Sequence, residues 1–169
     1  MRLFIAFDVS KEVHDYLLEL QKKLPEAKLT LTKSFHQTLK FLGEVSPDKA
    51  EKIKQLLSQV KFQLFTASLD GVGVFPSGGK PRVVWIGIEP KDIICNLQKQ
   101  IDEVLQGPKE KDFHPHITLA RIKDCDKSFK DQLARIPVEH LKFEVKNFKL
   151  IGSQLQDTGP IYRDIAIYQ

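Results

Sequence analysis

The pattern His-x-Thr-Leu occurs twice in this 169-residue chain, and it constrains the fold more than any other feature. His36 and Thr38 form the first copy, and His116 and Thr118 form the second copy 80 residues later. Side chains at positions i and i+2 of a β-strand point to the same face. Because the intervening residues are mostly apolar, the repeat predicts two strands. Each would carry one imidazole and one hydroxyl on a polar face, with an apolar back.

The rest of the chain alternates between strand and helix patterns. The strands cluster between paired helices, which predicts an α+β fold of antiparallel sheets with helices packed outside. Each motif strand is flanked by helices in sequence, and no linker divides the chain. We therefore expect a single domain, residues 1–169, with two similar lobes that each supply one motif. The expected helices begin near Ser10 and Ser46, span about Lys91 to Leu105, and span Ser128 to Arg135. Strands are expected at residues 62–69, 72–75 and 138–146 among others, and residues 26–33 are expected to form an extended link.

Composition excludes several classes of protein. No apolar run approaches the ~18 residues of a membrane-spanning helix. Residues 2–8 predict a buried first strand rather than a signal peptide. Cys95 and Cys125 lack metal-site spacing, which favours a cytoplasmic protein with reduced thiols. The formal net charge of +4 is compatible with a polyanionic partner or with an ordinary lysine-rich surface.

Two imidazoles that face each other across a cleft suit proton-transfer chemistry near neutral pH. One histidine must be neutral to accept a proton, and the other must be protonated to donate one. The hydroxyls of the two threonines can donate hydrogen bonds to phosphoryl oxygens. This chemistry requires no metal and no cofactor.

His114 allows two other interpretations. It can extend the site, or it can serve only to begin the strand beside Pro115, which is the simpler hypothesis. His114 and His116 also share a strand face, and Asp112 would continue that face as a third metal ligand. Asp112 lies in a charged link, so the metal site is the weaker alternative.

Several further segments of the chain, together with the two motifs, resemble the sequence pattern of a known family. The chain resembles the two-histidine (2H) phosphoesterase superfamily, and within it the RNA 2′,3′-cyclic phosphodiesterases, also called the 2′-5′ RNA ligase or LigT-like group. The resemblance covers essentially the whole chain. It rests on the paired motifs and on the segments Arg2–Asp8, Leu39–Glu44, Phe75–Ser77 and Pro81–Trp85.

The resemblance implies two lobes around a central cleft, in which both motifs face one phosphate. It implies metal-independent hydrolysis of an RNA 2′,3′-cyclic phosphate end to a 2′-phosphate. By analogy, His36 is the proton donor, His116 is the proton acceptor, and Thr38 and Thr118 bind the substrate phosphate. The resemblance also implies reversible 2′-5′ RNA ligation, in which a 2′,3′-cyclic end is joined to a 5′-hydroxyl. RNA ends, including those of tRNA halves, are the implied partners of a monomer that binds no membrane.

Lys40, Arg82 and Arg121 are candidate contacts to RNA. Strict alternation places Lys40 on the face of His36 and Thr38. It places Arg121 on the face away from His116, unless a bulge or the strand end redirects it. Two other functions remain open: an RNA-end binding module without turnover, and a cyclic phosphodiesterase that acts on a small nucleotide.

Overall fold

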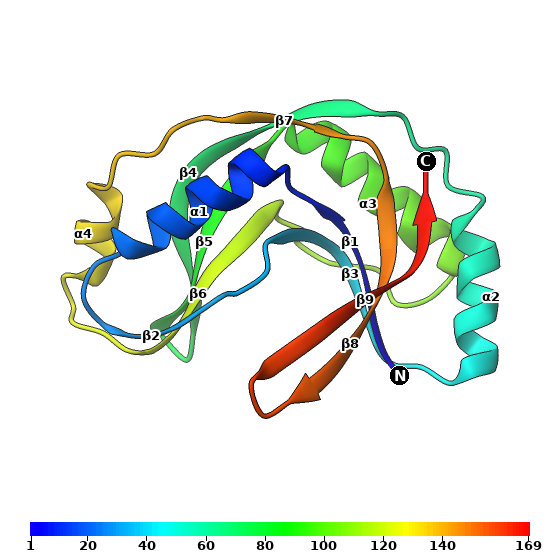
Figure 1. Ribbon diagram of the computed structural model, residues 1–169, viewed down its shortest axis with the longest axis horizontal. Coiled ribbons are helices and arrows are strands. Elements are labelled where there is room, and N and C mark those ends of the chain that lie inside the picture. The colour runs from blue at the N-terminus through cyan, green and yellow to red at the C-terminus, as the bar shows by residue number, and fades with distance from the viewer.

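The computed structural model describes residues 1–169 and contains nine strands and four helices (Figure 1). In chain order they are β1 (Arg2–Asp8), α1 (Lys11–Lys22), β2 (Lys28–Leu31), β3 (His36–Glu44), α2 (Pro47–Leu57), β4 (Phe65–Ser77), β5 (Lys80–Glu89), α3 (Lys91–Leu105), β6 (His116–Asp124), α4 (Phe129–Ala134), β7 (Lys142–Val145), β8 (Phe148–Gln156) and β9 (Gly159–Tyr168).

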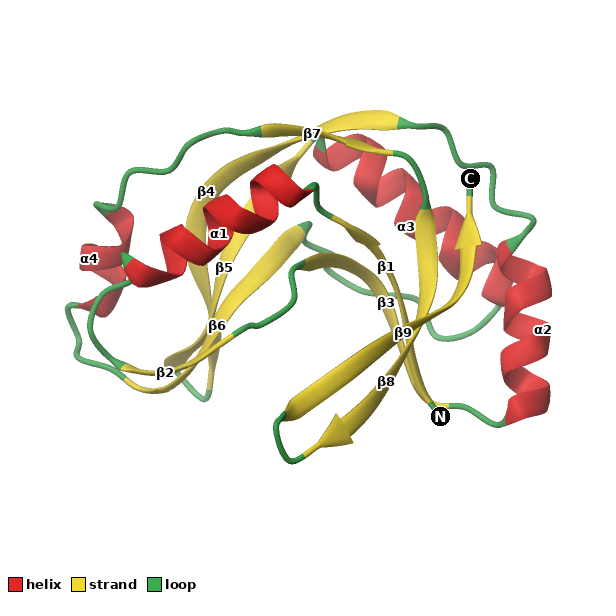
Figure 2. Cartoon of the chain, viewed as in Figure 1, coloured by secondary structure: helices red, strands yellow, loops and turns green.

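The strands form two antiparallel sheets. The four-stranded sheet has the order β3-β1-β8-β9, and the five-stranded sheet has the order β2-β6-β5-β4-β7. Figure 2 shows the sheets as two sides of an arch, with α1 and α4 on the side of the five-stranded sheet and α2 and α3 on the other side. The predicted α+β class, with antiparallel sheets and outer helices, is confirmed.

Three boundaries differ from the sequence prediction. The link at residues 26–33 contains the short strand β2, which pairs with β6. The two strands expected at 62–69 and 72–75 form one strand, β4, with a register shift between Leu69 and Val72 where it pairs with β5. The strand expected at 138–146 is shorter, because β7 pairs with β4 only at Lys142–Val145. Each difference depends on a partner strand that is distant in sequence.

Side-chain caps and a shared core hold the elements in place. Ser10 caps α1 by accepting a hydrogen bond from the Val13 amide at 3.3 Å. Ser46 caps α2 in the same way, followed by Pro47 at the first helical position. One cluster of 31 buried apolar residues draws on both sheets and all four helices. None of the helices is long and apolar enough to cross a membrane.

The two motif strands carry a β-bulge at the same place. In β3 the register to β1 passes from Thr38 to Lys40, which leaves Leu39 as the extra residue. In β6 the register to β5 passes from Thr118 to Ala120, which leaves Leu119 as the extra residue. A bulge interrupts the alternation of faces, so the residues beyond each leucine point opposite to the direction that strict alternation predicts.

A buried glutamine side chain donates a hydrogen bond beside each bulge. Gln21 Nε2 donates to the Leu119 carbonyl at 2.8 Å, and Gln37 Nε2 donates to the Thr38 carbonyl at 2.8 Å. Burying an unpaired carbonyl would cost free energy. These side chains therefore stabilise the two irregular stretches that follow the threonines.

Candidate active site

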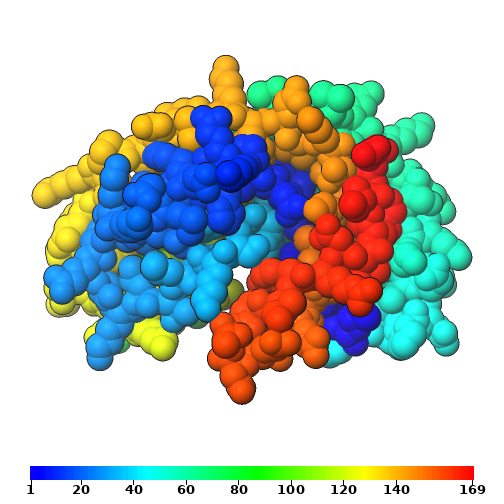
Figure 3. Space-filling view, in the orientation of Figure 1, coloured from blue at the N-terminus to red at the C-terminus, as the bar shows by residue number.

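All four motif side chains line one cleft of about 530 Å³. His36 and Thr38 reach it from β3 of the four-stranded sheet, and His116 and Thr118 reach it from β6 of the five-stranded sheet. Figure 3 shows a hollow between the light-blue segment near residue 30 and the orange β8–β9 hairpin. The cleft is lined by residues from both of these segments, including Thr32, Ser34, Leu155 and Pro160.

His116 is held in a defined orientation. Its Nδ1 lies 2.6 Å from the carbonyl oxygen of His114. A carbonyl oxygen can only accept a hydrogen bond, so Nδ1 carries the proton, and Nε2 is the nitrogen left for chemistry. The Phe75 ring contacts the imidazole edge-on, with the centroids 4.8 Å apart. Burial lowers the pKa of His116 and outweighs the opposing effect of the His114 carbonyl, which favours a neutral ring ready to accept a proton.

His36 lies among aromatic rings on the opposite sheet. The centroids of Phe4 and Tyr162 are 5.0 and 5.5 Å from its own centroid. Burial lowers the pKa of His36, whereas the carboxylate of Asp8 acts in the opposite direction. The two histidines therefore differ in their surroundings although their positions in the two motifs match.

Arg121 lines the cleft with the four motif residues. Strict alternation placed it on the other face of β6, and the bulge at Leu119 is what redirects it. The Arg121 charge also acts on the Tyr162 hydroxyl, whose pKa is raised by burial and lowered in part by this guanidinium. A cation that faces both the motif residues and an aromatic side chain suits a phosphorylated ligand.

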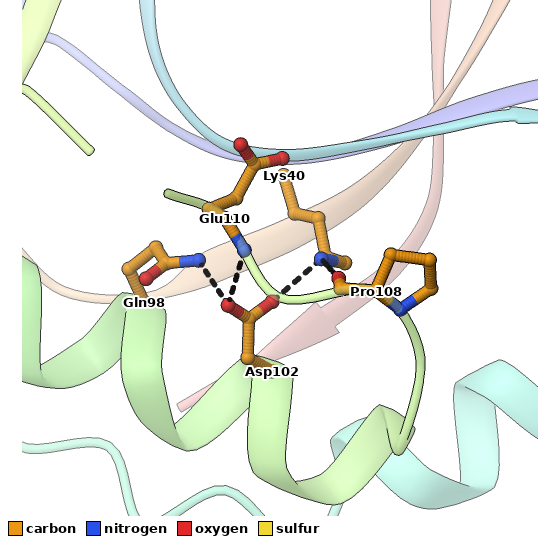
Figure 4. Close-up of polar contacts among 5 residues, drawn as sticks. All are labelled: Lys40, Gln98, Asp102, Pro108 and Glu110. Carbon is orange, nitrogen blue, oxygen red and sulfur yellow. Dashed lines mark hydrogen bonds and ion pairs between the residues drawn. The ribbon is translucent and has the colours of Figure 1, made fainter. Parts of the chain in front are cut away.

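The prediction that Lys40 shares the face of His36 is wrong. The bulge at Leu39 turns Lys40 into the interior, where its side chain is 7% exposed. Its Nζ donates to Asp102 Oδ1 and to the Pro108 carbonyl, both at 2.6 Å, as Figure 4 shows. Lys40 therefore holds β3 against α3 and is not available to contact RNA.

Asp102 is the centre of this buried network. Its second oxygen accepts hydrogen bonds from Gln98 Nε2 at 2.8 Å and from the Glu110 amide at 2.9 Å (Figure 4). Burial alone would raise the pKa of Asp102, but these bonds and Lys40 together lower it, so the carboxylate stays charged. The network joins β3 to the link that leads into β6, and so connects the two motif strands.

Two other sequence candidates lie outside the lining of the cleft. Arg82 Nη1 donates to the Lys123 carbonyl at 3.0 Å, and both residues line a different hollow. The His114 ring packs on Trp85, with centroids 4.9 Å apart, and its carbonyl orients His116. No three His, Cys, Asp or Glu side chains are grouped so that they could hold a metal ion.

The cleft residues that sequence reasoning missed include Arg2, Phe41 and Tyr162. Phe41 is 71% exposed, which is unusual for a phenylalanine, because the bulge turns it outward. Tyr162 belongs to the alternating pattern of the last strand, so the sequence predicts that it lies on a strand. Its position beside His36 depends on how the strands pair and was not predictable. Arg2 begins β1 and carried no signal that separates it from other surface cations.

Comparisons with known proteins agree with this geometry. The sequence model of the family described as LigT like Phosphoesterase matches the chain twice, at residues 7–85 and 86–162, and each match contains one motif. A protein of Archaeoglobus fulgidus named RNA 2′,3′-cyclic phosphodiesterase is 36% identical over 176 residues, covering 100% of both chains.

Solved structures share the fold over the whole chain. TT0787 of Thermus thermophilus has a TM-score of 0.78 and 30% identity, and the alignment covers 99% of this chain and 97% of that one. Escherichia coli LigT in complex with 3′-AMP has a TM-score of 0.77 and 26% identity, with coverage of 99% and 96%.

Paired antiparallel sheets that bring two His-x-Thr motifs to one cleft define an enzyme of the two-histidine phosphoesterase class. Both halves of the sequence match the same family, and the relatives align from end to end. The chain belongs to the LigT-like phosphoesterase family.

Proposed function

We propose that this phosphoesterase hydrolyses RNA 2′,3′-cyclic phosphate ends to 2′-phosphates, with His36 and His116 as the acid and base. The relative from Archaeoglobus fulgidus carries the name of this activity. Escherichia coli LigT, which shares the fold, has been crystallised with 3′-AMP. Both support a nucleotide phosphate as the group that the cleft receives.

The reaction under this proposal is an attack of water on the cyclic phosphorus. Nε2 of His116 takes a proton from the water as the new P–O bond forms. The bond from phosphorus to the 3′ oxygen breaks, and His36 donates a proton to that oxygen. The products are a 2′-phosphate and a free 3′-hydroxyl. A 5′-hydroxyl that attacks in place of water would form a 2′-5′ linkage, with each histidine in the same role. The two histidines exchange roles when that linkage is cleaved back to the cyclic phosphate.

Thr38 and Thr118 would donate hydrogen bonds to the non-bridging phosphate oxygens. Such donors are most effective when they are already in place as charge develops in the transition state. Arg121 would bind the same phosphate or the next one along the RNA. In this scheme the two sheets act as two lobes of one domain, and each lobe supplies one histidine and one threonine.

The observation that carries the proposal is the bond from His116 Nδ1 to the His114 carbonyl. It leaves Nε2 of a half-buried imidazole, whose lowered pKa favours the neutral form, in the cleft that His36 also lines. An in-line displacement at phosphorus places the attacking and leaving oxygens on opposite sides, so it requires a base in a fixed orientation opposite an acid. We further propose a cytoplasmic monomer that acts on tRNA halves among other RNA ends.

The test is incubation with a 2′,3′-cyclic-ended oligonucleotide in the presence of EDTA, and mass spectrometry of the product before and after treatment with a phosphatase that removes 3′-phosphates but not 2′-phosphates. We expect a 2′-phosphate and a free 3′-hydroxyl. Tight binding without product would instead favour an RNA-end binding module. Turnover of a cyclic mononucleotide but of no oligonucleotide would favour an esterase of small nucleotides.

A further inference from the structure

The two histidines differ in the residue that lies opposite each of them on the neighbouring strand. Asp8 of β1 is the cross-strand partner of His36, and Gly87 of β5 is the cross-strand partner of His116. Directly opposed residues in an antiparallel pair have Cβ atoms about 5 Å apart. One imidazole therefore has a carboxylate as its neighbour, whereas the other has no side chain at that position.

The Asp8 carboxylate is fixed by a charge network within the same sheet. Asp8 Oδ2 lies 2.7 Å from Nζ of Lys149 on β8, which lies 2.7 Å from Asp164 Oδ2 on β9. The Lys149 side chain is only 16% exposed. Burial lowers its pKa, but the hydrogen bonds that Lys149 donates to Asp164 and Asp8 outweigh burial and raise it, so Lys149 remains charged. Two carboxylates and one ammonium leave one net negative charge beside His36.

The other groups around His36 do not supply that charge. Phe4 of β1 and Tyr162 of β9 pack on its ring. Arg121 and His116 face it from the opposite wall of the cleft, and neither is an anion. Glu144 and Lys146 line the hollow that also contains Asp8, and they form an ion pair with each other at 3.8 Å. Asp8 is therefore the carboxylate placed to act on His36.

We propose that Asp8 is a positioning residue that stabilises the protonated form of His36, and that Lys149 and Asp164 hold its carboxylate in place. This inference rests on the proposed function, in which His36 donates the proton to the leaving oxygen. It explains why two matched motifs perform different tasks. The difference arises on the strand next to each motif rather than in the motif itself.

The electrostatics of His36 agree with this arrangement. Burial lowers its pKa, and Asp8 is the group that acts against that effect. At His116 the opposing group is a backbone carbonyl, which fixes the tautomer. A carboxylate stabilises an imidazolium through its charge, so the four-stranded sheet favours an acid where the five-stranded sheet favours a base.

The experiment is an NMR titration of the histidine ring nitrogens in the substrate-free protein, for the wild type, Asp8→Asn, Asp8→Glu and Asp131→Asn. Asp131 is an exposed acid in the first turn of α4. Asp131→Asn is the control, because it removes the same charge at a different site. We expect the His36 titration midpoint to fall in Asp8→Asn and to return toward the wild-type value in Asp8→Glu. The His116 midpoint should be unchanged in every variant, and Asp131→Asn should match the wild type.

Kinetics on a 2′,3′-cyclic-ended oligonucleotide provide the second readout. A lower pKa of the acid reduces its protonated fraction at high pH and leaves it unchanged at low pH. We therefore expect the loss of kcat/KM in Asp8→Asn to be at least ~3-fold larger at high pH than at low pH. A loss that is equal at every pH, with a normal His36 titration, would show that Asp8 has only a structural role.

The NMR result does not depend on turnover. A His36 midpoint that is the same in Asp8→Asn and Asp131→Asn overturns the inference even if the enzyme is active. If the midpoint shifts as expected but the wild type cleaves no cyclic phosphate, the proposed function fails instead. If Asp8→Asn does not fold, Asp164→Asn takes its place. In that variant Lys149 has only Asp8 as its partner, so no net negative charge remains beside His36. The titration midpoint of His36 should again fall, and an unchanged midpoint overturns the inference.

Discussion

Leu39 and Leu119 occupy the same structural position, because each is the extra residue of a β-bulge directly after a His-x-Thr pair. The bulges direct the next residues in matched ways. Lys40 and Ala120 turn into the interior, whereas Phe41 and Arg121 turn into the cleft. The same irregularity thus adds an aromatic ring to one wall of the site and a guanidinium to the other.

Replacement of either motif histidine should abolish most of the activity. We expect His36→Ala and His116→Ala each to lower kcat by about 10²- to 10⁴-fold, the usual contribution of a general acid or base. Because the two act on one transition state, the double variant should be far less impaired than the product of the single losses. Single-turnover rates on a cyclic-ended oligonucleotide measure this. His140→Ala, at an exposed site, is the control, and a native rate in either cleft variant would exclude the paired mechanism.

Loss of the Arg121 guanidinium should weaken binding of the phosphate. A hydrogen bond to a charged group contributes about 1.5–3 kcal/mol, so Arg121→Ala should lower kcat/KM by ~10- to 100-fold. Arg121→Lys should recover part of the loss, because it restores the charge but not the fork of donors. Arg82→Ala removes a guanidinium outside the cleft lining and should change little. Equal effects at the two positions would contradict a specific role for Arg121.

Phe41 should contribute to binding rather than to the chemical step. Its ring is exposed in the cleft, where a nucleobase can stack on it. Stacking of a base on an aromatic side chain contributes about 1–3 kcal/mol, so Phe41→Ala should raise KM by ~5- to 150-fold with little change in kcat. Leu64→Ala, at an exposed residue away from this cleft, is the control. A fall in kcat with a normal KM would contradict the stacking role.

Breaking the buried pair of Lys40 and Asp102 should destabilise the fold. Removal of one partner leaves an unpaired charge in the interior, which costs about 3–5 kcal/mol of unfolding free energy. Lys40→Met should therefore unfold at a much lower urea concentration. The double variant with Asp102→Leu should recover part of the loss, because no charge remains buried. Lys54→Met, in the exposed pair with Glu51, should leave the urea midpoint nearly unchanged.

The unfolding free energy should decrease as the pH is lowered, because of the two cleft histidines. Burial lowers the pKa of both from the ordinary value of 6.5, so between the lowered and ordinary values the unfolded chain binds more protons than the native one. The unfolding free energy then rises with pH through that window, and this contribution is lost progressively as the pH falls below about 6.5. Urea unfolding at a series of pH values measures the slope. His36→Gln and His116→Gln should each flatten it, whereas the exposed His140→Gln should not.

The sequence alone was enough to predict the class of fold and the four motif residues. A His-x-Thr pair within an apolar run is a local pattern with a period of two, so the face that carries the site follows from the chain itself. Helix starts at Ser10 and Ser46 were predictable for the same reason, since a cap bonds to an amide only three residues away.

The tertiary structure decided what surrounds those four residues. The bulges that bury Lys40 and expose Arg121 depend on hydrogen bonds to neighbouring strands, and no local pattern encodes that register. Asp102 lies 62 residues from Lys40 in the sequence, and Asp8 meets His36 only because β1 pairs with β3. The sequence thus determined which motif side chains line the cleft. Long-range strand pairing determined which charges and rings adjoin them, because those neighbours meet only when the sheets assemble.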